Sequence, residues 1–322
     1  MEGHRGKPMT FPAPVRSPLS LRTVIRFVLA GVLLVLLLQF VEPSKIAQAF
    51  ARARGELIAA ALALLLLNLG TQVVKWRQLL RKSGYTFANV LIAQSLLFGI
   101  TVGTLTPGQI GEFGGRAVLL RSDPERLVGL TIIDKLQILA VMALGGLPSF
   151  AVLFRLGLVP SILLGLAAAL VIVCLARPAQ CAMWTKDTLF RRAKSRWIHE
   201  FFAAAQVLRN TRLMASTTFL TAAFYAVLWL QVHFLLNAFF PVSPLDSFLG
   251  FAATMFAKSF FPLTFADLGI REIGLVYFLS LRSVPQEAAF NASILLFAIN
   301  ILLPSIIGLF FIPESVSFKA RQ

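Results

Sequence analysis

Two stretches of this chain interrupt an apolar run with glycine, proline and charged residues, and they constrain the fold more than any other feature. The first stretch is Thr104–Arg116. The apolar run that begins at Val90 stops there at a Pro-Gly pair, and three further glycines follow the pair. Irregular, charged backbone at membrane depth is tolerated only where protein or a water-filled cavity covers it. The stretch therefore predicts an interior site within a bundle of membrane helices.

The second stretch repeats the first at an offset of 158 positions. Leu263–Gly269 aligns without a gap with Leu105–Gly111, and an apolar run precedes each copy. Charged residues follow both copies: Glu112 and Arg116, then Arg271 and Glu272. Broken segments at corresponding positions of two halves indicate the binding site of a transporter. The alternative is a chance match, since short matches of Leu, Thr and Gly are common in apolar chains.

The composition places the chain in a membrane. Of its 322 residues, 57% are hydrophobic and only 14% are charged. We therefore expect an all-α integral membrane protein without a separate soluble domain. The net charge of +16 is attributed to Lys and Arg in cytoplasmic loops, because no nucleic-acid-binding module is present. The two cysteines and three scattered histidines form no metal motif, so we expect neither a metal nor another cofactor.

Six apolar runs are long enough to cross a membrane. The predicted spans are 23–40, 56–74, 127–147, 158–176, 213–239 and 288–312. Two further elements, 88–105 and 245–262, are predicted to be re-entrant or broken, and a short helix follows at 271–281. The first span has an alternative interpretation as a cleaved signal peptide, but the small-residue site at Ala47–Ala49 lies well past its apolar core.

These elements predict one transmembrane domain with tails at both ends. The predicted divisions are a disordered basic cytoplasmic tail (1–22), the transmembrane domain (23–312) with half-repeats near 56–176 and 213–312, and a C-terminal tail (313–322). Within the first half, Asn68 and Gln72 stand four residues apart and should face the bundle interior. Lys75 and Trp76 are assigned to a short basic loop beginning at 75, with the tryptophan at the interface.

The distribution of Lys and Arg sets the topology. If both broken elements are re-entrant, the cytoplasmic side holds the two termini, the segments 75–87 and 106–126 and the basic gap 177–212. These carry 21 of the 30 basic residues, and seven lie outside. If 88–105 crossed the membrane fully, the gap would face outward, against the positive-inside rule. The first element then opens to the cytoplasm and the second to the outside, which is an inverted repeat.

Ionisable residues beside the two breaks are the candidate site, because charge at the bilayer centre costs about 2.5–3.5 kcal/mol per residue on insertion scales. The predicted headgroup-binding residues are Thr106, Pro107, Gly108, Gly111, Glu112, Arg116, Lys258, Asp267, Gly269, Arg271 and Glu272. The residues predicted for proton or ion coupling are Asp134, Lys135, Glu112 and Asp267. The alternative is that these charges only neutralise one another, for instance Glu112 with Arg116 one helical turn away.

The breaks also suggest how a ligand would bind. A helix that starts after Thr106-Pro107-Gly108, or after 264–266, would point its free N–H groups and positive dipole end into the bundle. With Arg116, Lys258 and Arg271 nearby, such a site suits an anionic group, for example a lipid phosphate. The carboxylates would then bind a cationic headgroup or carry protons.

The first stretch, with Arg116 four residues after Glu112, resembles the Pro-Gly-x-x-Gly-Glu-x-x-Arg signature of the lysylphosphatidylglycerol synthase transmembrane region, also called the flippase-like family. Asp134-Lys135 stands where that family has Asp-Arg, and Leu268–Glu272 resembles its second-half Gly-x-Gly-x-Arg-Glu element. The resemblance covers roughly residues 22–312. One extra residue separates Glu112 from Arg116, and Ala266-Asp267 replaces the usual Gly-Gly, so the detailed site differs from the family pattern.

The resemblance implies a multi-helix domain of the bacterial inner membrane that handles lipids, in some members by moving aminoacylated phosphatidylglycerol between leaflets. We find no soluble aminoacyltransferase domain and no catalytic motif, so we do not expect an enzyme. The expected function is binding and translocation of a lipid with a charged headgroup: a phospholipid, aminoacyl-phospholipid, glycolipid or polyprenyl phosphate. The alternatives are a non-transporting membrane partner of a separate lipid synthase or glycosyltransferase, and a membrane-embedded lipid-phosphate transferase.

Overall fold

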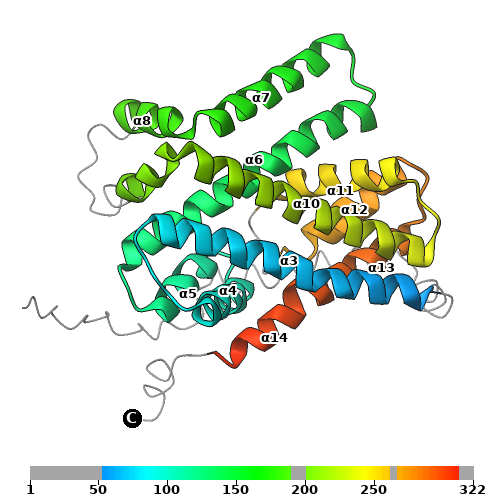
Figure 1. The fold of residues 1–322 in the computed structure, drawn as a ribbon. Coiled ribbons are helices and arrows are strands. Elements are labelled where there is room, and N and C mark those ends of the chain that lie inside the picture. Colours follow the sequence, from blue (N-terminus) through cyan, green and yellow to red (C-terminus); the bar gives the residue numbers. More distant parts are fainter. Residues whose placement is uncertain (1–52, 190–200, 262–266, 312–322) are drawn as a thin grey trace, which may run out of the picture.

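The computed structural model describes residues 53–189, 201–261 and 267–311, and this part of the chain is helical throughout, without strands (Figure 1). Five of its helices are long and apolar enough to cross a membrane. They are α3 (Gly55–Lys82), α6 (Pro124–Leu153), α7 (Leu158–Ala176), α10 (Thr211–Phe239) and Gln286–Leu309. Five of the six predicted spans are thereby confirmed in a multi-pass membrane protein. The remaining span, 23–40, and both predicted tails lie outside the described residues.

The last crossing segment is not one regular helix. It consists of α13 (Gln286–Phe297), the π-helical turn η2 (Ala298–Leu302) and α14 (Leu303–Leu309). The shorter elements are α4 (Asn89–Thr104), α5 (Gly111–Leu120), α8 (Pro178–Leu189), η1 (Ala205–Arg209), α11 (Pro244–Lys258) and α12 (Ile270–Ser280). The bounds predicted for the two broken elements agree with those of α4 and α11 to within a few residues. Part of the second break, 262–266, lies outside the described residues.

The prediction of a basic loop directly after the second span is wrong. Helix α3 continues to Lys82, so Lys75 and Trp76 belong to the helix and are buried rather than interfacial. The connection from α3 to α4 is only 83–88. The helix continues past its charged residues because the Lys75 ammonium group finds a partner in the protein interior, as described below.

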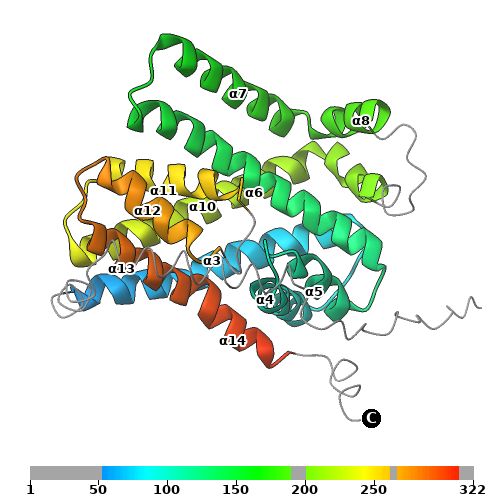
Figure 2. The same cartoon turned by 180° about the vertical axis from the view of Figure 1, so that it is seen from behind.

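The chain repeats one arrangement twice: a long helix, two short helices and another long helix. The long helices α3 and α10 pack along each other, α11 packs on α6, and α4 packs in the equivalent way on α14. The two short pairs, α4 with α5 and α11 with α12, lie toward opposite ends of the long helices in both views (Figures 1 and 2). This arrangement is that of two similar halves placed in opposite directions.

Glycines allow the short helices of each pair to approach closely. A Cβ atom on Gly99 would lie 2.6 Å from Cγ of Arg116, and one on Gly115 would lie 3.0 Å from Cα of Gly99. In the second half, a Cβ atom on Gly250 would lie 2.5 Å from Cδ2 of Leu279. Small residues at such interfaces let backbones pack together within a membrane. The close approach fixes the position of Arg116 relative to α4.

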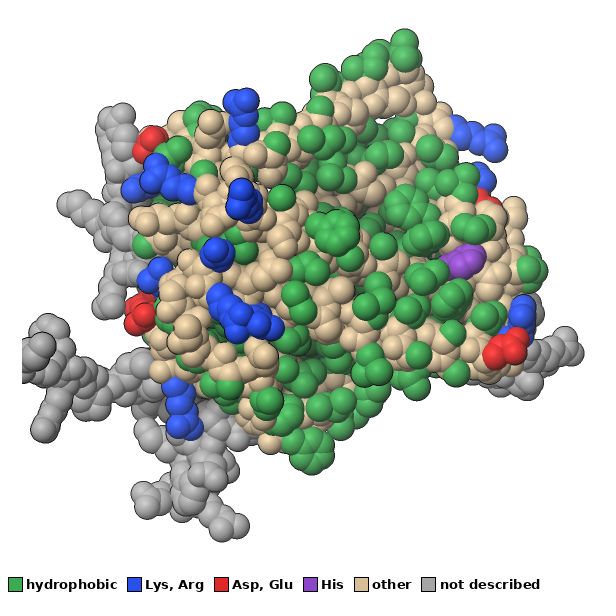
Figure 3. All heavy atoms as spheres, in the orientation of Figure 1, with side chains coloured by type: hydrophobic (Ala, Val, Ile, Leu, Met, Phe, Trp, Pro, Cys, Tyr) green, Lys and Arg blue, Asp and Glu red, His purple; other side chains and the backbone are tan. Residues whose placement is uncertain are grey.

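Helix α7 stands apart from the rest of the bundle. None of its residues is buried, whereas α6 and α10 each bury more than a third of their most apolar window. Figures 1 and 3 show α7 along one edge of the molecule, with apolar side chains over most of the face that is drawn. Helix α7 packs on α6, and its remaining apolar surface is the kind that faces lipid in a membrane helix. Lys and Arg side chains gather at the end of this face near α8 and the start of α10 (Figure 3).

An ion pair joins α11 to the loop that follows α12. We expect it to make the stability of the protein depend on pH. Ser243 caps α11 by accepting the Asp246 N–H at 3.0 Å, and the Asp246 carboxylate accepts from Arg282. Burial alone would raise the Asp246 pKa, but hydrogen bonds from Ser243 and Arg282 outweigh it and hold the pKa below its usual value. A lowered pKa stabilises the fold at neutral pH, and this contribution is lost as the pH falls through the folded-state pKa.

Asp246→Asn is therefore expected to destabilise the protein by less than about 1 kcal/mol at neutral pH. The difference from the wild type should shrink as the pH is lowered from about 5 to about 2. The measurement is the unfolding midpoint in detergent at each pH. Asp187→Asn, at an exposed position of α8, is the matched control. An Asp246→Asn effect that is independent of pH would contradict the assignment.

Candidate functional site

A cavity of about 160 Å³ lies where the two halves meet. Three cations and one carboxylate line it: Lys135, Lys258, Arg271 and Glu112. Five polar side chains also line it: Asn68, Gln72, Thr104, Gln109 and Asn300. The rest of the lining is apolar and includes Met142, Phe224 and Leu296. The prediction that Asn68 and Gln72 face the interior is confirmed, and Gln72 Nε2 donates to Asn68 Oδ1 at 2.7 Å. The cavity therefore joins charged residues of both halves within a membrane-spanning bundle.

Arg116 pairs with a residue of the cavity lining but does not itself line the cavity. Its guanidinium donates to Asp134 Oδ2 at 3.0 Å and to Glu112, and it lies 5.2 Å from the ring centroid of Trp76. The side chain is 1% exposed. Asp134 also receives the Lys75 ammonium group at 2.7 Å. The internal pairing weighed from the sequence thus accounts for Arg116 and Asp134, which leaves neither free to bind a phosphate or a cationic headgroup.

Lys135 and Glu112 form the part of this cluster that reaches the cavity. Lys135 Nζ lies 2.6 Å from Glu112 Oε2, and the lysine side chain is 32% exposed. Glu112 itself is almost fully buried, and its other carboxylate oxygen accepts from Arg116. Lys135 is therefore the accessible cation of the first half, held in place by a carboxylate that is itself anchored.

The second half presents Lys258 and Asp267 to the same region. Lys258 Nζ lies 2.7 Å from Asp267 Oδ2, and Gln109 Nε2 donates to that oxygen at 3.2 Å. Gln109 and Asp267 are the residues that align at the offset of 158, and both adopt left-handed backbone conformations, with φ of 57° and 59°. The equivalent turns of the two halves therefore touch each other beside the cavity.

Arg271 and Glu272 form a second buried pair. Arg271 lines the cavity, pairs with Glu272 and lies 5.3 Å from the ring centroid of Phe297. Glu272 also accepts from Ser293 at 3.2 Å and from the Gly269 N–H at 2.7 Å, where φ is 86°. Glu272 is fully buried and does not line the cavity. Its role in this geometry is to cap α12 and to orient Arg271.

The helix N-termini do not offer the free N–H groups that the sequence suggested. At α5, Gly111 N–H donates to the Thr106 hydroxyl at 2.7 Å, and Glu112 N–H donates to the Gln109 carbonyl at 3.1 Å. At α12, the Glu272 carboxylate takes the Gly269 N–H. These groups are satisfied inside the turns, so an anion would be bound by side chains instead.

The turn residues of the first break therefore shape the site rather than line it. Thr106, Pro107, Gly108 and Gly111 are absent from the cavity lining. The Thr106 hydroxyl bridges the end of α4 to the start of α5, and Gly108 adopts φ of 61°. A Cβ atom on Gly111 would lie 2.5 Å from the Val102 carbonyl oxygen. This tight turn positions Gln109 and Glu112 at the cavity.

The charges around the cavity do not cancel. The cationic side chains are Lys75, Arg116, Lys135, Lys258 and Arg271, and the carboxylates are Glu112, Asp134, Asp267 and Glu272. Among these described residues one positive charge is in excess. Each of these cations has at least one carboxylate partner, and Glu112 and Asp134 are each shared between two cations.

Sequence reasoning missed Lys75 and Asn300. Lys75 stands seven residues after Asn68 and three after Gln72, which places all three on one face of α3, and this spacing was the available signal. Asn300 lies within the π-helical turn η2 and reaches the cavity there. The sequence carries no evident signal for that turn, although π-helical turns occur frequently at functional sites.

A comparison with known protein families supports the resemblance drawn from the sequence. Residues 23–308 match the family described as Lysylphosphatidylglycerol synthase TM region. A search of curated proteins finds no match to this chain. The matched range covers most of the sequence and includes both short helix pairs and every charged residue around the cavity. The chain therefore belongs to the lysylphosphatidylglycerol synthase transmembrane-region family.

Proposed function

We propose that this membrane protein binds the charged headgroup of a lipid in the cavity between its halves and moves that lipid across the bilayer, without catalysing a reaction. The observation that carries the proposal is the cavity lining, which places Lys135, Lys258, Arg271 and Glu112 from both halves around one cavity. Membership of a family of lipid-related membrane domains agrees with this function. The proposed location is the bacterial inner membrane, with both termini in the cytoplasm.

The charge and the polar groups indicate which headgroups fit. One excess positive charge suits a phosphodiester, which carries a single negative charge. Asn68 Nδ2 and Asn300 Oδ1 are buried without a hydrogen-bond partner, so the cavity also offers one donor and one acceptor to hydroxyl or amine groups of a headgroup. A cavity of about 160 Å³ holds a headgroup but not acyl chains, which would stay in the bilayer. Phospholipids with one net negative charge, such as phosphatidylglycerol, satisfy these conditions.

The ion pairs suggest how the ligand is taken up and released. A phosphate oxygen would replace Glu112 as the partner of Lys135 and would share Lys258 with Asp267, so that no cation is left unpaired at any stage. The two short helix pairs lie toward opposite ends of the bundle, and we propose that they enter the membrane from opposite faces (Figure 2). Movement of one pair at a time would open the cavity to each leaflet in turn.

Removing the two accessible cations tests this function. In Lys135→Gln/Lys258→Gln, the cavity loses the groups that bind phosphate, and we expect the rate of lipid movement to fall at least about tenfold, which corresponds to about 1.4 kcal/mol. The measurement follows fluorescent phosphatidylglycerol between leaflets of vesicles that contain the full chain. Lys186→Gln, on exposed α8, is the matched control, and unfolding midpoints verify that all variants fold.

An unchanged rate in the double variant would overturn the proposal. A chemically altered lipid in the wild type that is absent in Glu112→Gln would instead support a transferase. If no lipid moves in the wild type but a lipid synthase or glycosyltransferase co-purifies with it, the protein is better described as a membrane partner of that enzyme.

A further inference from the structure

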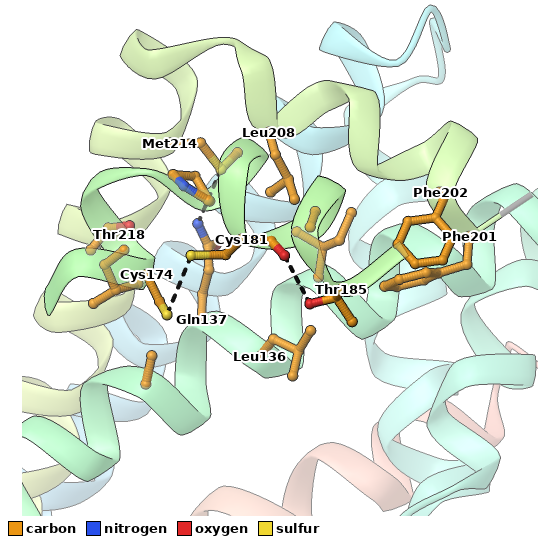
Figure 4. A pocket seen from close by; sticks show the side chains of 15 residues that line it. Leu136, Gln137, Cys174, Cys181, Thr185, Phe201, Phe202, Leu208, Met214 and Thr218 are labelled. Atoms are coloured by element: carbon orange, nitrogen blue, oxygen red, sulfur yellow. Dashed lines mark hydrogen bonds between the residues drawn. The ribbon is translucent and has the colours of Figure 1, made fainter. Parts of the chain in front are cut away.

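A second pocket, separate from the charged cavity, lies between α6, the α7–α8 corner, η1 and the start of α10 (Figure 4). Its volume is about 310 Å³, at the lower end of the range of small-molecule sites. None of its lining residues is charged. Most are apolar, including Leu136, Phe201, Phe202 and Met214, and the polar ones include Gln137. The lining therefore suits an apolar ligand and disfavours a phosphate.

Gln137 supplies the one buried polar atom in this pocket that lacks a partner among the described residues. Gln137 is 6% exposed, and its Oε1 is buried without a hydrogen bond. Its Nε2 faces Thr217 Oγ1 at 2.9 Å and Met214 Sδ at 3.6 Å. Figure 4 shows this side chain reaching toward Met214 from α6. A buried polar atom without a hydrogen bond is unfavourable, so a partner for it would be stabilising.

The neighbouring hydroxyl fixes the orientation of the amide. The Thr217 hydroxyl donates its hydrogen to the Leu213 carbonyl at 3.0 Å, so its oxygen can only accept from Gln137. If the Gln137 amide were turned over, its Oε1 would face the Thr217 hydroxyl oxygen, so that two acceptors would face each other. The NH2 group therefore stays on Thr217, and the unpaired atom is an acceptor. The group that satisfies it has to be a hydrogen-bond donor.

We propose that this pocket binds a neutral lipid through a free hydroxyl group, which donates to Gln137 Oε1 while the lipid chain lies against the apolar lining. The bilayer is the nearest source of such a molecule, because α7, which contributes Cys174 and Leu175, is apolar and has no buried residue. The pocket lies beside Arg177, the residue that joins α7 to α8, at the end of a helix long enough and apolar enough to cross a membrane. This site is independent of the charged cavity.

The two cysteines of the chain provide a direct readout. Cys174 and Cys181 both line the pocket, are free thiols and have sulfur atoms 3.4 Å apart. A bound lipid would cover them and slow their reaction with a maleimide. The probe is a diacylglycerol added to phosphatidylcholine nanodiscs that contain the full chain. Its O-methyl ether is the comparison, because it has the same chains but no hydroxyl donor.

We expect diacylglycerol to slow thiol alkylation at least about threefold, and the ether and phosphatidylglycerol to slow it much less. In Gln137→Leu, the difference between diacylglycerol and its ether should disappear. Gln180→Leu, at an exposed position on α8, should retain it. The unfolding midpoint of each variant shows whether the bundle is intact, and Gln137→Met provides a second variant without the acceptor.

The proposal is overturned if diacylglycerol and its ether protect equally, if neither protects the thiols, or if Gln137→Leu and Gln137→Met keep the difference. Absence of any protection would mean that water or nothing occupies the pocket. Because the assay contains no transport step, its outcome is separate from that of the proposed lipid movement.

Discussion

Asp134→Asn is expected to destabilise the protein by about 3–5 kcal/mol, the usual cost of removing one partner from a buried ion pair. Asp134 is the shared counterion of Lys75 and Arg116, and all three side chains are less than a tenth exposed. Asparagine keeps the shape of the side chain but leaves Lys75 with a backbone carbonyl, the Asp134 oxygen at 3.2 Å, as its remaining partner. Chemical unfolding in detergent, followed by circular dichroism, measures the loss.

A second substitution should restore part of this stability. Adding Lys75→Met to Asp134→Asn removes the cation that has lost its counterion and keeps the aliphatic volume, so the double variant should be more stable than Asp134→Asn alone. A double-mutant cycle gives the coupling directly, and residues in one ion network couple by about 0.5–3 kcal/mol. Additive effects of the two substitutions would mean that Lys75 and Asp134 do not form the pair described above.

Gly308→Leu is expected to cost about 3 kcal/mol or more, or to prevent assembly, because α14 has no room for a side chain at this position. A Cβ atom on Gly308 would collide with the Thr101 hydroxyl and with the Leu97 carbonyl oxygen of α4. The contact cannot open easily, since Thr101 also donates to the Ser305 carbonyl at 2.9 Å. The yield of folded protein and its unfolding midpoint in detergent measure the effect.

Gly165→Leu is the matched control for this prediction. Gly165 lies in lipid-facing α7, and no atom lies within 4 Å of the Cβ position there. Leucine is a better helix former than glycine by roughly 1 kcal/mol, so this variant should be as stable as the wild type or slightly more stable. A similar loss in both variants would show that hydrophobic bulk, and not the α4–α14 contact, causes the defect.

The sequence predicted the helices well because membrane helices leave a strong local signal. A long apolar run identified α7 to the residue, and the Pro-Gly and Asp-x-Gly turns located the ends of α4 and the start of α12. The end of α3 was missed because a local rule places Lys75 and Trp76 at an interface. Lys75 pairs with Asp134, 59 residues away in sequence, and Trp76 donates to Ser95, so no local pattern reveals that the two residues are buried.

The candidate residues were recognised better than their roles. Charges beside the breaks were predicted to collect at one site, and the structure brings Glu112, Lys135, Lys258 and Arg271 to the same cavity. From the sequence, Arg116 and Arg271 were predicted to share one role, yet Arg116 is enclosed by two carboxylates and a tryptophan. Which arginine stays accessible depends on how many acceptors surround it in three dimensions, and the spacing along the chain does not contain that information.

The hydrogen bond between Gln109 and Asp267 also bears on which residues a two-fold repeated chain can carry where its halves meet. A chain formed by duplicating one half would carry the same residue at both positions, and that residue would face its own copy. Two aspartates would repel each other there, whereas glutamine with aspartate is mutually satisfied. At this point the two halves meet through residues of different type, whereas Arg116 and Arg271 each pair with carboxylates of their own half.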